Sequence, residues 1–126
     1  MLRSLFIGLT CALVGCSHAA SELVVYSARN EQYIKPLFDA YTKETGTQIK
    51  FITDKEGVLM QRIKAEGVNT PADMLMTVDA GNLWEAAKED LLRPIVSPAL
   101  HANIPAPLRD PAGEWFGLSV RARTIF

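Results

Sequence analysis

Cysteine and histidine are scarce in this sequence of 126 residues, and each shortage excludes a class of site. The two cysteines, Cys11 and Cys16, both precede the body of the chain, which is left without a disulfide. The two histidines, His18 and His101, cannot build a histidine-rich zinc site. P-loop, GxGxxG, HExxH, nucleophile-elbow and CxxC patterns are also missing. We therefore expect a protein that is not an enzyme.

An excess of charge of one sign is lacking as well. The sequence has 13 basic and 14 acidic residues, with a net charge of −1, and no run of like charge. This balance gives no electrostatic footprint for nucleic acid, so we predict no nucleic-acid partner. With 48% hydrophobic and 21% charged residues, the composition is that of an ordinary folded domain.

No apolar run is long enough to anchor the chain in a bilayer. The first run, residues 5–14, follows Arg3 and is typical of a signal peptide. Residues 13–16 (LVGC) have the order of a bacterial lipoprotein signal, in which residues 1–15 are removed and Cys16 carries the lipid anchor. Ordinary cleavage near residues 19–20 is the alternative and leaves no lipid. Both predict export to the periplasm.

Three apolar runs predict buried strands. Residues 23–26 form a continuous β-favouring run, as in a strand covered on both faces of a parallel sheet. Residues 48–53 and residues 72–77 are the second and third predicted strands.

Between the first two runs, apolar residues recur at the spacing of a helix. Ile34, Leu37, Phe38 and Tyr41 lie on one face of a helix predicted over residues 31–45, with Gly46 as its left-handed end.

Two further helices follow the second and third strands. Leu59, Met60 and Ile63 predict a short helix before Gly67. Asp79 is a plausible N-cap for the other, which carries Leu83, Trp84, Ala87 and Leu91 and ends at Pro94. The resulting βαβαβα order predicts an α/β fold, a parallel sheet with helices on both faces.

The last third of the chain has a different pattern. Prolines between residues 94 and 111 predict an extended connection rather than a helix. Residues 115–119 and residues 124–126 resemble later strands. Because the sequence stops inside an apolar run, we expect the front portion of a longer protein.

Three polar loops follow the three predicted strands, at residues 27–31, 53–57 and 77–81. The carboxyl ends of parallel strands meet at one edge, so the loops would converge there, as suits an anion or a hard metal ion. The same residue types also serve as helix caps and turns. Arg121 and Arg123 would share one strand face and hold an anion, or pair with carboxylates.

Several segments together resemble the periplasmic ferric-iron-binding proteins of ABC importers, a branch of the two-lobed extracellular solute-binding proteins. They are the lipoprotein-like leader, VYSAR at 25–29, FDAY at 38–41 with TG at 45–46, PAD at 71–73 and WFGLSVRAR at 115–123. The resemblance implies that residues 16–126 are the first lobe, truncated. It also implies a monomeric receptor that delivers Fe³⁺ to a membrane permease.

The resemblance further implies how the cargo is held. Fe³⁺ would bind tyrosine phenolates of the second lobe, beyond Phe126, with a synergistic anion such as carbonate or phosphate. Hard Fe³⁺ favours such oxygen ligands. Arg29 and Arg121 match arginines near the family's anion, and with Ser27 they are the expected anion or cleft residues.

The family's first-lobe metal ligands are not matched. Asn30 and Glu31 stand where some members have histidine and tyrosine. Glu31 and Asp79 are therefore the candidate carboxylate ligands, or else the first lobe supplies none. Alternatives for the whole chain are a receptor for another anion, a polyamine or an organic solute, or a non-functional truncated cell-envelope lipoprotein.

Overall fold

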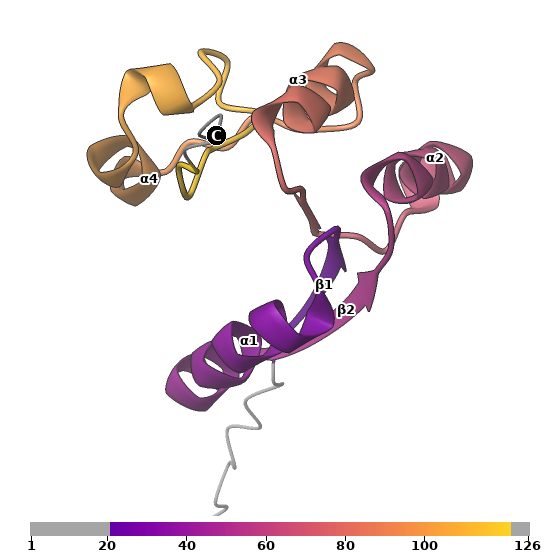
Figure 1. The fold of residues 1–126 in the computed structure, drawn as a ribbon, viewed down its shortest axis with the longest axis vertical. Coiled ribbons are helices and arrows are strands. Elements are labelled where there is room, and N and C mark those ends of the chain that lie inside the picture. Colours follow the sequence, from indigo (N-terminus) through magenta and orange to yellow (C-terminus); the bar gives the residue numbers. More distant parts are fainter. Residues whose placement is uncertain (1–20, 122–126) are drawn as a thin grey trace, which may run out of the picture.

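Strands and helices alternate along the chain in a computed structural model that describes residues 21–121 (Figure 1). The elements are β1 (Glu22–Ser27), α1 (Glu31–Thr45), β2 (Gln48–Thr53), α2 (Glu56–Glu66), η1 (Gly67–Asn69), β3 (Met74–Met76), α3 (Ala80–Lys88), α4 (Pro98–Asn103) and η2 (Ala106–Leu108). The predicted βαβαβα order is confirmed.

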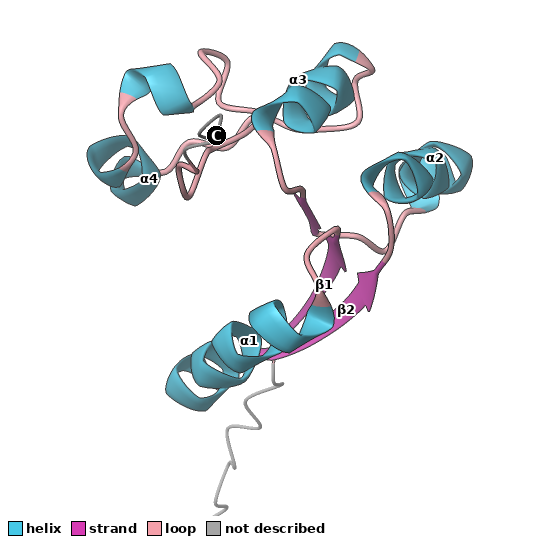
Figure 2. Ribbon diagram, in the orientation of Figure 1, coloured by secondary structure: helices cyan, strands magenta, loops and turns pink. Residues whose placement is uncertain are grey.

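The three strands form one parallel sheet in the order β2-β1-β3 (Figure 2). Along β1, Glu22 pairs with Gln48 and Ser27 pairs with Thr53. Strand β3 pairs with β1 over three residues, and Met76 lies opposite Ser27. It is shorter than the strand predicted over residues 72–77. Because all strands run the same way, their carboxyl ends lie at one edge of the sheet.

Helix α1 covers one face of this sheet. Its residues Ile34 and Phe38 are buried against Val25 of β1. Leu37 and Tyr41, which the spacing placed on the same inner face, are 60% and 44% exposed. The prediction of that face was too wide, because the side chains at i and i+4 fill the contact with the sheet.

The ends of α1 agree with the sequence prediction. Asn30 precedes the helix, and its Oδ1 accepts a hydrogen bond from the N–H of Gln32 at 3.0 Å. Gly46 ends it with φ 76, a left-handed conformation that glycine adopts without steric cost.

Helix α2 covers the opposite face. Tyr26 of β1 packs with Leu59 and Ile63 of the helix, and Ile52, Leu75 and Leu91 are among the half-buried residues around them. Neighbouring residues of one strand point to opposite faces, so Val25 and Tyr26 join different clusters. The predicted parallel sheet with helices on both faces is confirmed.

Helix α3 ends sooner than predicted, at Lys88 rather than near Leu91. Asp90 has φ 56, which interrupts the helix, and the N–H of Leu91 donates to the carbonyl of Ala86 at 3.0 Å. Ala86 is fully buried, whereas Trp84 is 59% exposed. The buried side of α3 is therefore the one that carries Ala86.

The stretch from 94 to 111 is not the extended connection that its prolines predicted. Pro98 opens α4, where its missing N–H costs nothing, and Oγ of Ser97 caps the helix by accepting from the N–H of Leu100 at 3.3 Å. The second 3₁₀ turn, η2, follows it.

The strand predicted over residues 115–119 was also wrong. Phe116 makes one isolated antiparallel bridge with Arg109, and the N–H of Gly117 donates to the carbonyl of Leu108 at 2.7 Å. A strand needs a partner along its length, and within residues 21–121 this segment has only that bridge. The strand predicted over residues 124–126 lies outside the described residues.

The predicted signal peptide, residues 1–15, and the lipid-carrying Cys16 also lie outside the described residues. Among residues 21–121, no helix combines the length and the apolar character needed to cross a membrane.

Candidate functional site

A shallow cavity of about 390 Å³ lies at the carboxyl edge of the sheet, between the loops that follow β1 and β2. It is lined by Ala28, Arg29, Asn30, Thr53, Asp54, Lys55 and Glu56. Both loops lead into helices, α1 and α2, so two helix N-termini border the cavity. The convergence predicted for these two loops is confirmed.

Ser27 accepts one hydrogen bond within its own loop and one from the loop after β2. Ser27 is fully buried, and its Oγ accepts a hydrogen bond from the N–H of Arg29 at 3.1 Å. Its carbonyl accepts from the N–H of Asp54 at 3.3 Å. The side chain of Ser27 is thus engaged in shaping the Arg29 loop, and it is not among the residues that line the cavity.

The cavity offers groups of both signs. Arg29 and Lys55 bring positive charge, and Asp54 and Glu56 bring negative charge. Lys55 occupies the N-cap position of α2 without a capping side-chain bond, so the first N–H groups of that helix have no side-chain partner from their cap. The positive side chains and the exposed N–H groups of the helix are the part of this wall that suits an anion.

The third predicted loop does not join the cavity. Asp79 instead caps α3, because its Oδ1 accepts from the N–H of Asn82 at 3.0 Å and from the Asn82 side chain at 3.1 Å. Nδ2 of Asn82 also donates to Oδ2 of Asp79 at 3.0 Å. Both carboxylate oxygens of Asp79 therefore have partners within α3.

Two further predicted site residues, Glu31 and Arg121, are also not among the residues that line the cavity. Glu31 is exposed in the first turn of α1 and does not line the cavity. Arg121 is exposed and is the last described residue, while Arg123 lies outside the described range. Of the predicted anion residues, the cavity wall includes Arg29 alone.

Sequence reasoning missed Asp54, Lys55 and Glu56 as individual candidates. The signal that could have found them was the position of residues 53–57 directly after the second strand. Within residues 21–121, no group of three or more histidine, cysteine, aspartate or glutamate side chains is placed to hold a metal ion.

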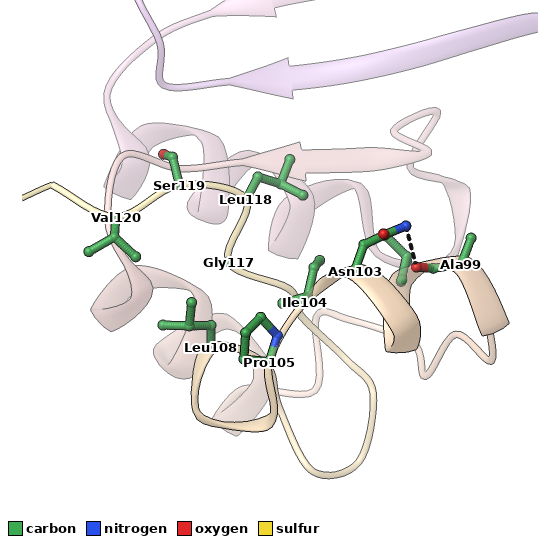
Figure 3. A pocket seen from close by; sticks show the side chains of 10 residues that line it. Ala99, Asn103, Ile104, Pro105, Leu108, Gly117, Leu118, Ser119 and Val120 are labelled. Atoms are coloured by element: carbon green, nitrogen blue, oxygen red, sulfur yellow. Dashed lines mark hydrogen bonds between the residues drawn. The ribbon is translucent and has the colours of Figure 1, made fainter.

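A second cavity, of about 420 Å³, lies between α4 and residues 117–120 (Figure 3). Its wall is mostly apolar, with Ile104, Leu108 and Leu118 among the lining residues. Asn103 donates from Nδ2 to the carbonyl of Ala99 at 2.9 Å, so its amide is partly satisfied. None of the described residues that line this groove carries a charged side chain.

The chain is similar to several iron uptake and ferric binding proteins. Iron uptake protein A1 of Synechocystis is 42% identical over 104 residues, which are 82% of this chain and 29% of the relative. The structure of Trichodesmium IdiA (FutA) in complex with iron and citrate matches at a TM-score of 0.73 with 45% identity, over 77% of this chain and 31% of that one. The ferric binding protein of Campylobacter jejuni matches at a TM-score of 0.73 with 38% sequence identity. The match covers 75% of this chain and 30% of that protein.

A more distant relative is named for a different ligand. The putative 2-aminoethylphosphonate-binding periplasmic protein of Salmonella typhi is 35% identical over 60% of this chain and 24% of its own length. No family model matches the chain.

The parallel sheet with helices on both faces is thus the fold of a lobe in the ferric-binding periplasmic proteins. More particularly, the chain is a homologue of part of the iron uptake and ferric iron-binding proteins. It spans between 29% and 31% of the length of the three similar proteins described above.

Proposed function

We propose that this chain is part of the substrate-binding component of an ABC importer, which captures ferric iron in the periplasm and delivers it to a membrane permease. The observation that carries the proposal is the 45% identity to a protein solved with iron and citrate, together with the shared fold. The charged cavity at the carboxyl edge supports it, because binding sites of open parallel sheets form there.

In this proposal the described lobe binds the anion that accompanies the metal. Arg29 donates charge-assisted hydrogen bonds to carbonate, phosphate or a carboxylate of an iron chelate. Lys55 and the first N–H groups of α2 add positive potential. Arg121 and Ser27 remain candidate cleft residues, Ser27 through the hydrogen bond that its Oγ accepts from the N–H of Arg29.

Direct coordination of iron by this lobe has less support. Asp79 is engaged in capping α3, and Glu31 lies outside the cavity wall. Phenolate ligands supplied by another part of the protein, as the family resemblance implies, would provide the oxygen donors that Fe³⁺ prefers. The protein acts by binding alone, as a monomer, with closure of two lobes favoured when the ligand contacts both. Cys16 would anchor it to the membrane through a lipid.

A visible absorption band tests the iron proposal. The protein encoded by the complete reading frame should develop a phenolate-to-iron band when it is titrated with ferric citrate. A protein that stays colourless and does not retain iron would contradict the assignment.

The relative named as binding 2-aminoethylphosphonate favours a second candidate, an organic phosphonate or another anion as cargo. Competition between ferric citrate and 2-aminoethylphosphonate for the protein separates the two. If the phosphonate binds and iron does not, the receptor role stands and its cargo changes.

A further inference from the structure

Three side chains donate hydrogen bonds to the carboxylate of Glu66, at the end of α2, and one of them comes from β1. Tyr26 is fully buried, and its hydroxyl donates to both carboxylate oxygens of Glu66 at 2.9 Å. The same carboxylate accepts from Nε of Arg62 at 2.8 Å and from the hydroxyl of Thr70 at 2.7 Å. Thr70 precedes β3, so Glu66 holds a strand, a helix and the connection to the next strand.

The charges within this cluster are matched. Hydrogen bonds from Arg62 and Thr70 lower the pKa of Glu66, which is therefore ionised at neutral pH. Burial, and then the hydrogen bond to Glu66, raise the pKa of Tyr26. The Arg62 guanidinium also lies 5.1 Å from the centre of the Tyr26 ring. Tyr26 is thus a neutral phenol with an engaged hydroxyl and not a phenolate available to a metal.

Tyr26 leads directly into the wall of the candidate cavity. The next residue, Ser27, accepts the hydrogen bond from the N–H of Arg29. Ala28 packs against the same apolar cluster as Tyr26, and its N–H donates to the carbonyl of Met76 at 2.8 Å. The loop that carries Arg29 is therefore joined to the buried end of β1 through Ser27 and Ala28.

We propose that Tyr26 and Glu66 form a positioning pair, which fixes the carboxyl end of β1 and so orients Arg29 in the cavity. The consequence for ligand binding depends on the proposed function. The ordering of the loop by the pair does not depend on the proposed function, because it can be measured in the chain without any ligand.

Backbone amide hydrogen exchange of the full chain tests the pair directly. Tyr26→Phe removes the hydroxyl and keeps the ring, and we expect exchange at Ala28 and Arg29 to become about fivefold faster or more, as a locally loosened segment requires. Exchange at Phe38, buried by α1 on the other face, should not change. Tyr41→Phe, on the exposed side of α1, is the matched control and should change neither.

Two results would overturn the proposal. One is unchanged exchange at Arg29 in Tyr26→Phe, and the other is equal acceleration at Arg29 and Phe38, which indicates general loss of stability. If Tyr26→Phe does not fold, exchange at Arg29 and Phe38 is compared in Glu66→Gln and in Thr70→Val. Each of these variants removes a different part of the cluster, and the same two results would overturn the proposal.

Ligand binding supplies the separate functional readout. With inorganic phosphate and ferric citrate as probes, Tyr26→Phe should weaken binding about threefold or more, because a misplaced positioning loop lowers affinity. Binding at full strength in a variant with faster exchange at Arg29 would contradict the orienting role. If the unaltered protein binds neither probe, the proposed function fails, and the exchange experiment still decides whether the pair orders the loop.

Discussion

At the scale of single residues, ligand binding depends on which charged side chains reach the cavity. Arg29 and Lys55 lie in its wall, and so do Asp54 and Glu56. The N–H of Lys55 donates to Oδ1 of Asp54 at 2.7 Å, so that carboxylate partly satisfies its own loop. Arg29 is thus the side chain best suited to bind an oxyanion here.

Arg29→Gln tests this assignment. We expect binding of phosphate or ferric citrate to weaken about tenfold, because one charge-assisted hydrogen bond contributes roughly 1.5–3 kcal/mol. Isothermal titration calorimetry measures the effect. Arg93→Gln, at an exposed position outside both cavity walls, is the matched control and should bind as the unaltered protein does. Equal effects of the two substitutions would contradict a specific role for Arg29.

The Glu66 cluster makes the free energy of unfolding sensitive to acid. Its hydrogen bonds lower the pKa of Glu66, so the stabilisation is present above the unfolded-state glutamate pKa of about 4.3 and is lost as pH falls through the lower folded value. Urea denaturation from about pH 6 to about pH 3 should show a steeper loss for the unaltered protein than for Glu66→Gln. Parallel curves would show that Glu66 does not contribute.

At the scale of elements, α1 presents two different faces. Ile34 and Phe38 pack against the sheet, while Leu37 is 60% exposed. Phe38→Ala should cost about 3–5 kcal/mol of the free energy of unfolding, since it leaves a cavity in the core. Leu37→Ala, one residue away, should change it by no more than about 0.5 kcal/mol. Chemical denaturation of both variants checks the difference, and similar losses would contradict the assigned faces.

Substitutions of Asp79 test whether its side chain serves as a helix cap or as a metal ligand. As the N-cap of α3, it should contribute about 1 kcal/mol to the free energy of unfolding, and Asp79→Asn should keep much of that amount. Both Asp79→Ala and Asp79→Asn should leave ferric iron affinity unchanged. Loss of iron binding in the folded Asp79→Asn variant would restore the carboxylate-ligand hypothesis.

Several elements could be predicted from the sequence because local signals determine them. The helical period together with Asn30 and Gly46 defined α1, and β-favouring apolar runs located β1 and β2. The buried side of α1 could not be resolved, since the spacing includes Leu37 on the same stripe as Phe38. Pro98 was misread because proline is unfavourable inside a helix and favourable at its first turn.

At the scale of the whole molecule, the parallel order of the strands explains how much of the site could be predicted. The carboxyl ends of parallel strands lie at one edge of the sheet, so the meeting of the loops at Arg29 and Asp54 could be predicted from the order of elements, whereas the same reasoning failed for the loop after β3. The sequence could not show that Asp79 folds back to cap α3. It also could not distinguish the residues that line the cavity, such as Asn30, from a neighbour that does not, Glu31.

Ferric titration of the protein encoded by the complete reading frame is the most direct test of the central claim, that Arg29 helps this lobe bind the anion of a ferric cargo. Visible absorption should show a phenolate-to-iron band with ferric citrate. The Arg29→Gln variant should reach the same band only at about tenfold higher ferric citrate, a shift that corresponds to about 1.4 kcal/mol. Absence of the band in the unaltered protein, or identical titrations of the two proteins, would contradict the account.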